Sequence, residues 1–389
     1  TGIMKRFLLL LLGFLLSLSA IKAQNPGGLD LSFNPTGINT GTGANQFVHA
    51  SVRQTDGKII SVGNFTFYNG VAQNRIIRLN PDGTLDPTFN IGTGANATIW
   101  TVALQSDGKI LIGGDFSQFN GISSNRIARL NSDGSVDSEF AIGNGFNGRV
   151  YSVFIQSNSK ILVGGEFTGF NGVSRPFSAR LESNGLLDAS FIPGYVGGPV
   201  RSIVSTSDGS IYLAGGFAFN IVKLTSTGNL INGWCQCGVS GIVFALHVQD
   251  DDKLLVGGRF TSSGPAGDRN DLIRINPNGT IDTSFFFWGL TINNYILSIS
   301  PQNDGKILIA GNFQSQRWNV ARLNSNGSLD NTFNTMTGGT NMPLWNVLSL
   351  PDGKAIVGGE FTSVNGNSRN YLAQLNSDGS YEVMGAGAN

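Results

Sequence analysis

The chain has little charge and no excess of either sign. Charged residues make up 13% of its 389 residues, where about 25% is usual. Lys+Arg and Asp+Glu are equal at 25 each, so no basic surplus is present to neutralise the phosphates of a nucleic acid. We therefore expect no nucleic-acid partner.

Histidine and cysteine are also scarce, and this argues against common catalytic and metal sites. His49 and His247 lack the spacing of zinc hydrolases, and there is no Gly-x-Ser-x-Gly sequence. Cys235 and Cys237 have no further metal ligands nearby. We expect two buried thiols there, with a disulfide as the alternative. The sequence predicts no metal and no cofactor, and it favours a protein that is not an enzyme without settling the matter.

Only one stretch is long and apolar, and it lies near the N-terminus. The basic pair Lys5 and Arg6 precedes an apolar run over 7–18, which is the charge order of a secretory signal. The run is shorter than the about 20 residues of a membrane span. We predict a signal peptide over 4–23 and a mature chain over 24–389 that has no membrane span and is secreted or held at the cell surface.

Glycine, in contrast, is abundant and recurs in register. The chain has 54 glycines, about twice the usual share of about 7%. The clearest repeat reads Asp-Gly-Lys-Ile-Leu-Ile-Gly-Gly-Asp-Phe over 107–116. The second glycine of the doublet predicts a close approach between blades near their common axis. The Phe that ends this segment marks seven copies, at Phe65, Phe116, Phe167, Phe217, Phe260, Phe313 and Phe361.

Each copy contains four predicted strands. They are an alternating run such as 151–155, the glycine-rich run such as 160–167, an Arg-Leu-Asn run, and Leu-Asp-x-x-Phe as at 329–333. Four short antiparallel strands in about 50 residues are typical of one propeller blade. We predict an all-β fold: a single, monomeric seven-bladed β-propeller of four-stranded antiparallel blades over 24–389.

The ring needs a strand from one end of the chain to complete its last blade. A Leu-Asp-x-x-Phe segment precedes the first copy at 29–33. We predict that 29–33 forms the outer strand of the last blade, whose edge would otherwise be open. The alternative is that 380–384 pairs there through a simple hairpin.

A base and an acid recur eight residues apart in the third and fourth predicted strands. A three-residue loop with glycine, such as Gly83, would place them opposite each other. Because the base and the acid occur together in the same copies, we expect pairs that stabilise the blades rather than a ring of binding arginines. The pairs are Arg78/Asp86, Arg129/Asp137, Arg180/Asp188, Arg274/Asp282 and Arg322/Asp330.

One repeat position indicates a site. The residue between the recurring glycine and phenylalanine should form a ring around the axis, because its seven copies are equivalent. We interpret the ring as a polar or ion site at the channel mouth. The other interpretation is that it satisfies loop amides. Its members are Asn64, Asp115, Glu166, Gly216, Arg259, Asn312 and Glu360.

Aromatic residues gather in two connections of copies 5 and 6. Phe286 and Trp288 follow the fourth strand of copy 5, and Trp318 lies in the short loop of copy 6. They suggest a platform for a sugar or a protein. Packing between blades 5 and 6 is the alternative.

The repeat resembles the delta-60 repeat family, a bacterial β-propeller repeat of unassigned function. The resemblance rests on Leu-Asp-x-x-Phe, Asp-Gly-Lys-Ile-Leu-x-Gly-Gly-x-Phe, Asn-Gly and Arg-Leu-Asn-x-Asp-Gly, and covers roughly residues 29–380. Copies 1, 2, 3 and 7 match best, copy 4 departs and copy 6 is shortened. The resemblance implies a secreted or surface-associated propeller and brings no catalytic residues.

The sequence thus favours an exported, non-enzymatic β-propeller scaffold. It would bind a protein or glycan partner through the variable loops of one face. The alternative is a polysaccharide-directed hydrolase or lyase that uses acids at the channel mouth, such as Asp115, Glu166 and Glu360.

Overall fold

The computed structural model describes residues 43–194, 197–263, 267–287, 294–313, 319–333 and 339–377. Every regular element in these residues is a β-strand. They contain no helix long and apolar enough to cross a membrane. The predicted signal peptide over 4–23 and the two candidate closing segments, 29–33 and 380–384, lie outside the described residues.

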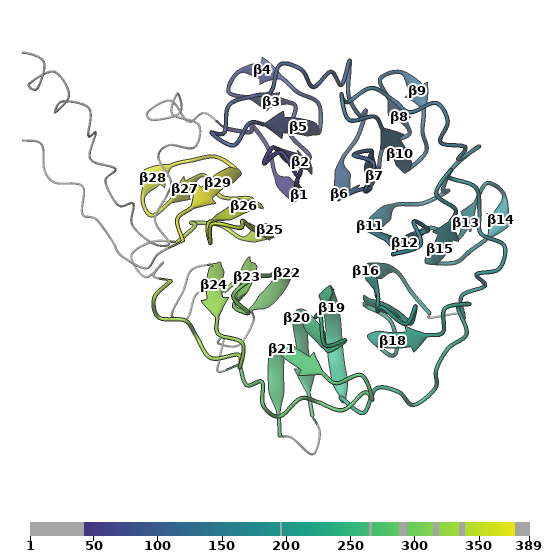
Figure 1. The fold of residues 1–389 in the computed structure, drawn as a ribbon, viewed down its shortest axis with the longest axis vertical. Helices are drawn as coiled ribbons and strands as arrows, with labels where there is room; N and C mark the ends of the chain where they lie inside the picture. Colours follow the sequence, from purple (N-terminus) through teal and green to yellow (C-terminus); the bar gives the residue numbers. More distant parts are fainter. Residues whose placement is uncertain are drawn as a thin grey trace, which may run out of the picture.

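The strands form seven three-stranded antiparallel sheets arranged around a common centre (Figure 1). In each sheet the first strand lies nearest the centre. The first strands are β1 (Val48–Arg53), β6 (Ile99–Leu104), β11 (Val150–Ile155), β16 (Val200–Ser205), β19 (Val239–Val248), β22 (Tyr295–Pro301) and β25 (Leu344–Ser349). The middle strands are β2 (Ile59–Gly63), β7 (Ile110–Gly114), β12 (Ile161–Gly165), β17 (Ile211–Gly215), β20 (Leu254–Ser262), β23 (Ile307–Asn312) and β26 (Ala355–Gly359). The third strands are β5 (Ile76–Leu79), β10 (Ile127–Leu130), β15 (Ser178–Leu181), β18 (Ile221–Leu224), β21 (Arg269–Ile275), β24 (Val320–Leu323) and β29 (Leu372–Leu375).

The first strands contact one another in order around the centre, and β25 contacts β1. The two ends also meet where Gly43 bridges Asn370 and where Val48 of β1 packs against Gly358 of β26. Sheets set radially around an axis, with the last against the first, define a β-propeller.

The predicted fourth strand is shorter than expected. After each of the first six third strands the chain turns back and makes a single bridge, as between Leu79 and Leu85. The described sheets are therefore three-stranded, not four-stranded. The reason is local: Asp86 Oδ1 accepts a hydrogen bond from Thr88 N at 2.9 Å, and Asp86 O accepts one from Phe89 N at 3.2 Å. These bonds turn the chain before a second residue pair can form.

The turn before this bridge is the predicted three-residue loop. In copy 1, Asn80 N donates to Thr84 O, and Gly83 N donates to Asn80 O, both at 2.8 Å. Gly83 has a φ of 80°, a left-handed conformation that glycine adopts without steric cost. This loop reverses the chain, so the acid that follows it lies opposite the base of the third strand.

The Asn-Gly sequences form small hairpins between the middle and third strands of four copies, and we name them the rim hairpins. Asn69 and Gly70 have φ values of 50° and 79°, as a two-residue hairpin turn of type I′ requires. Copy 4 has no such hairpin in its described residues. The hairpins are β3–β4 (Phe67–Tyr68, Val71–Ala72), β8–β9 (Gln118–Phe119, Ile122–Ser123), β13–β14 (Gly169–Phe170, Val173–Ser174) and β27–β28 (Ser363–Val364, Asn367–Ser368).

The two glycines of each doublet allow two different contacts. A Cβ on Gly164 would lie 2.6 Å from the side chain of Val200 in the next blade. A Cβ on Gly165 would lie 2.1 Å from Arg149 O, in the segment leading into the first strand of its own blade. The close approach between blades therefore belongs to the first glycine, and our assignment of it to the second was wrong.

Candidate functional site

Every first strand contains a β-bulge at the same place. In β6 the pairing with β7 passes from Ile99 to Thr101 and skips Trp100. A bulge leaves the extra residue unpaired and redirects its side chain. The seven skipped residues are His49, Trp100, Tyr151, Arg201, Phe244, Leu297 and Trp345.

All seven skipped residues line one cavity of about 260 Å³, together with Arg149. The seven innermost strands surround a common centre (Figure 1). A cavity that is lined from all seven therefore lies on the axis of the ring. We name it the axial pocket. Its rings are in contact: the centroid of Trp100 lies 4.1 Å from that of His49 and 6.1 Å from that of Trp345.

The three acids of the predicted polar ring bond to the axial aromatics. Each accepts a hydrogen bond from the skipped residue of its own copy, fifteen positions earlier. The donors and acceptors are Trp100 Nε1 and Asp115 Oδ2 at 3.1 Å, Tyr151 Oη and Glu166 Oε2 at 2.9 Å, and Trp345 Nε1 and Glu360 Oε1 at 3.0 Å. These side chains therefore hold the axial rings in place, and in these bonds they do not serve loop amides.

Arg149 holds two of these acids. Its Nε donates to Asp115 Oδ1, and its Nη1 donates to Tyr151 Oη at 3.1 Å and lies 3.8 Å from Glu166 Oε2. Burial would lower the pKa of Arg149, but the bonds to Asp115 and Tyr151 raise it above its usual value. The positive charge of Arg149 therefore lies within ion-pair distance of both Asp115 and Glu166.

The other members of the ring are not acidic. Asn64 Oδ1 accepts a hydrogen bond from Thr98 Oγ1 at 3.0 Å, and Asn312 pairs with Tyr295 at the end of β23. Arg259 is exposed, and Gly216 brings no side chain. The ring is therefore acidic in copies 2, 3 and 7, and it is open or basic in copies 4 and 5.

Arg201 is an axial cation without an acid. Its guanidinium carbon lies 4.9 Å from the ring centroid of Tyr151 and 5.6 Å from that of Phe244. The position fifteen residues later, which supplies an acid to three other copies, is Gly216. The guanidinium makes no hydrogen bond or ion pair with any residue that the structure describes.

His49 is the most enclosed axial side chain. It is 8% exposed, and its Nδ1 has no hydrogen-bond partner within the described residues. Burial lowers the pKa of His49 to about 3, so the ring is neutral at physiological pH. A buried polar atom without a partner next to a cavity is a place for a ligand group or a water.

The predicted base–acid pairs form outside the axial pocket, and we name them the outer ties. In all five, arginine Nε donates to aspartate Oδ2 at 2.6–2.8 Å. The turn lysine of the same copy reaches the same oxygen, as Lys160 reaches Asp188 at 2.8 Å. The predicted pairing is confirmed, and both partners of each pair are buried.

The outer ties also join neighbouring blades, which the sequence analysis missed. Arg180 Nη1 donates to Ser226 O, in the turn of the next copy, at 2.5 Å. The guanidinium carbon of Arg180 lies 4.8 Å from the ring centroid of Phe191. Burial would raise the pKa of Asp188, but hydrogen bonds from Lys160, Ser190 and Arg180 lower it below its usual range.

The predicted aromatic platform is only partly described. Trp288 and Trp318 lie outside the described residues. Phe286 lies under Arg269, with its ring centroid 3.9 Å from the guanidinium carbon, and Phe286 N donates to Asn326 O of copy 6 at 2.8 Å. These contacts favour packing between copies 5 and 6, away from the axial pocket.

The cysteines form a disulfide, so our expectation of two thiols was wrong. Cys235 and Cys237 are bonded, with Cα atoms 5.2 Å apart. Their segment is a loop in which the two side chains converge, because it lacks strand geometry. The described residues hold no cluster of three or more His, Cys, Asp and Glu side chains that could bind a metal ion.

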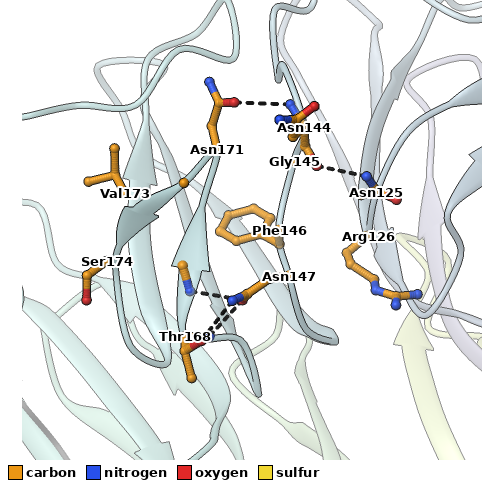
Figure 2. Close-up of a pocket in the computed structure, with 12 residues that line it drawn as sticks. Asn125, Arg126, Asn144, Gly145, Phe146, Asn147, Thr168, Asn171, Val173 and Ser174 are labelled. Atoms are coloured by element: carbon orange, nitrogen blue, oxygen red, sulfur yellow. Dashed lines mark hydrogen bonds between the residues drawn. The ribbon is translucent and has the colours of Figure 1, made fainter.

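A second cavity, of about 640 Å³, lies between copies 2 and 3 near the hairpin β13–β14 (Figure 2). Its asparagines bond within the protein: Asn125 Nδ2 donates to Asn144 O at 2.8 Å, and Asn147 Oδ1 accepts from Thr168 N at 2.9 Å. A smaller cavity with equivalent residues, including Asn74 and Asn96, lies between copies 1 and 2. The repetition and the internal bonds identify these grooves as joints between blades.

Comparison with known proteins identifies the class and the family. The repeats and radial sheets define a β-propeller repeat protein. A model described as a domain of unknown function (DUF5122) β-propeller matches residues 54–89, 105–140, 156–191, 249–285, 302–333 and 350–381. These segments cover more than half of the chain, which therefore belongs to the DUF5122 β-propeller family. The delta-60 name stays a prediction. No curated protein matches the chain in sequence.

Solved structures share the fold at low identity. The chain is similar to the WD40 repeats of RRP9 (12% identity, TM-score 0.56, 91% of this chain and 99% of that chain). It is similar to the extracellular domain of a putative one-component system from B. thetaiotaomicron (14%, 0.55, 92% and 43%). It is also similar to virginiamycin B lyase from Staphylococcus aureus (15%, 0.50, 87% and 96%). At such identities the similarity shows the fold alone.

Proposed function

We propose that the chain is an exported, non-enzymatic propeller of seven blades that binds a glycan outside the cell at its axial pocket. Export would remove the signal peptide over 4–23. The observation that supports binding at the axis is the convergence of seven equivalent bulge residues on one cavity. Each bulge interrupts the regular pairing of an inner strand and directs one side chain to the axis. Bulges are frequent beside functional sites.

The contents of the axial pocket fit a sugar. Pockets for drug-sized ligands occupy about 300–1,000 Å³, so a cavity of about 260 Å³ suits one sugar unit. The faces of Trp100, Tyr151 and Trp345 offer apolar surface to a sugar ring, and their carboxylate partners can accept hydrogen bonds from its hydroxyls. A protein partner, the other candidate from the sequence, would need a single side chain or chain end to enter the pocket.

The same acids are what a polysaccharide hydrolase or lyase would use. Their contacts favour binding instead, because Asp115, Glu166 and Glu360 each already accept a hydrogen bond from an axial aromatic. A general acid or base must exchange protons with the substrate, and Arg149 keeps Asp115 and Glu166 in a paired state. Extracellular domains among the similar structures are in keeping with export.

A glycan array and a pull-down from culture medium test this proposal, alongside an activity screen on polysaccharides. We expect saturable glycan binding without product release. Trp345→Ala should weaken it at least about tenfold, as loss of a central aromatic anchor does. Phe67→Ala, at an exposed aromatic on the rim hairpin β3–β4, is the matched control and should bind normally. Turnover that Glu166→Gln abolishes would overturn the binding-only function.

Export has its own test. The secreted protein should begin at Gln24 when its N-terminus is sequenced. An N-terminus that retains the apolar run over 7–18 would contradict the proposed cleavage.

A further inference from the structure

Some arginines of the molecule have a carboxylate partner among the described residues, and others do not. Each arginine of the five outer ties pairs with an aspartate, and Arg149 pairs with Asp115. Arg201 lies in the axial pocket and has no such partner among the residues that the structure describes. A partly enclosed guanidinium without an anion is a ready partner for a planar carboxylate, which it binds through two parallel N–H groups.

We infer that the axial pocket binds a sugar carrying a carboxylate, a uronic acid unit of an acidic polysaccharide, and that Arg201 recognises that carboxylate. This inference rests on the proposed function and names its ligand class. The contacts of Arg201 with Tyr151 and Phe244 use the ring faces of these residues. They leave the edge of the guanidinium, which carries its N–H donors, available to a ligand.

Gly216 explains why the anion must come from outside. In copies 2, 3 and 7 the residue fifteen positions after the axial one is an acid that bonds to it. In copy 4 that position is Gly216, so this copy has no carboxylate there, and Arg201 forms no ion pair with any residue in the described part of the chain. The omission leaves room, because a Cβ built on Gly216 meets nothing closer than 3.6 Å.

The remaining charges orient the ligand. Arg259, the ring member of the next copy, is exposed and adds a second positive charge on this side. Asp271 interacts with Arg259 electrostatically but forms no ion pair with it among the described residues. Asp115, Glu166 and Glu360 lie in copies 2, 3 and 7. A carboxylate would therefore turn toward copies 4 and 5, and the sugar hydroxyls toward the acids.

The test measures the affinity of the mature protein for short oligosaccharides by calorimetry. The probes are oligogalacturonate, oligoalginate and hyaluronan oligosaccharides, each also as its methyl ester. We expect at least one acid to bind about ten- to a hundredfold more tightly than its ester, as a hydrogen-bonded charge pair implies. Arg201→Gln should reduce acid binding to the level of the ester. Arg53→Gln, at an exposed arginine at the far end of β1, is the control.

A sharper variant supplies the missing acid. Gly216→Asp should give Arg201 an internal partner and abolish the preference for the acid over the ester, whereas Gly216→Asn should keep it. Equal affinity for acid and ester, both weakened by Trp345→Ala, would refute the carboxylate and leave the proposed function standing. If none of the probes binds and the glycan array is empty, both fail. If a peptide with a free C-terminus binds more tightly than every uronate, through Arg201, the ligand class is wrong.

Discussion

The outer ties and the axial pocket use arginine for opposite purposes. In an outer tie, Arg180 is buried, bonded to Asp188 of its own blade and bonded to Ser226 O of the next. In the axial pocket, Arg201 lies against two aromatic rings and pairs with no acid of the described residues. In this propeller, therefore, a repeated charge that brings its counter-charge belongs to the scaffold, and a charge whose counter-charge is missing indicates a ligand.

Copy 4 is where the two regions change together. Its outer position holds Lys223 opposite Ile231, so it has no tie, and its ring position is Gly216. Its described residues form no rim hairpin, and it is the copy that the family model leaves unmatched. The blade that departs most from the repeat is therefore the blade that opens the basic side of the axial pocket.

Low pH should protonate the aspartates of all five outer ties and cause the largest loss of stability. Hydrogen bonds from Ser284 and Arg274 lower the pKa of Asp282 to about 2 despite its burial, against an ordinary value of 3.8. A carboxyl with a lowered folded pKa contributes stability above its unfolded pKa and loses it as the pH falls toward the folded one. We expect the melting temperature to fall steeply between about pH 4 and 2, below the pH range in which the raised pKa of Asp271 changes stability. A flat profile would contradict the role of the ties.

Breaking one outer tie should cost less than acid but more than any change at the axis. Arg180→Ala leaves the buried Asp188 with Lys160 as its one cationic partner among the described residues, and we expect a loss of about 3 kcal/mol in the free energy of unfolding. Lys223→Ala, at the same position in copy 4 but without an acid, should cost less than about 1 kcal/mol. Urea denaturation of the two variants measures the difference, and equal losses would show that the pair does not stabilise the blade.

Two adjacent glycines of copy 4 differ in the space around them: Gly215 is closely packed, and Gly216, the ring position, is not. Gly215→Ala would place Cβ 2.1 Å from Pro199 O, whereas Gly216→Ala meets nothing closer than 3.6 Å. We expect the first to destabilise the fold by about 1–3 kcal/mol and the second to stay within about 0.5 kcal/mol of the parent. Thermal melting of both variants is the check. A large loss of stability in Gly216→Ala would show that this position has no room for a side chain.

Asp271 should give a pH dependence of stability that is opposite to that of the outer ties. Burial raises its pKa to about 6, although Phe260 N–H and Arg259 act against the rise. A raised acid pKa makes the folded state bind the proton more tightly, so stability falls as the pH rises from about 4 to about 6. Asp271→Asn should remove this slope and be more stable at pH 7. Asn319 makes the equivalent bond to Phe313 N in copy 6, so the asparagine has a structural precedent.

The sequence predicted the features that repeat with local chemistry. The turn glycines and the Arg–Asp register follow from hairpin geometry and were confirmed in the structure. The axial pocket was missed because the bulge breaks strand alternation: in β6 the buried residues are Ile99 and Val102, three positions apart instead of two. The signal was present, since an aromatic or polar residue lies fifteen positions before the ring member in six of the seven copies, Leu297 being the exception. The bonds between blades could not be predicted, because they join residues of different copies.

A structure of the protein with a bound uronate oligosaccharide tests the central claim most directly. We predict that a sugar ring lies against Trp100 and Trp345 and that its carboxylate lies within hydrogen-bond distance of Arg201. A ligand held in the grooves beside the rim hairpins, with nothing at the axis, would contradict this account.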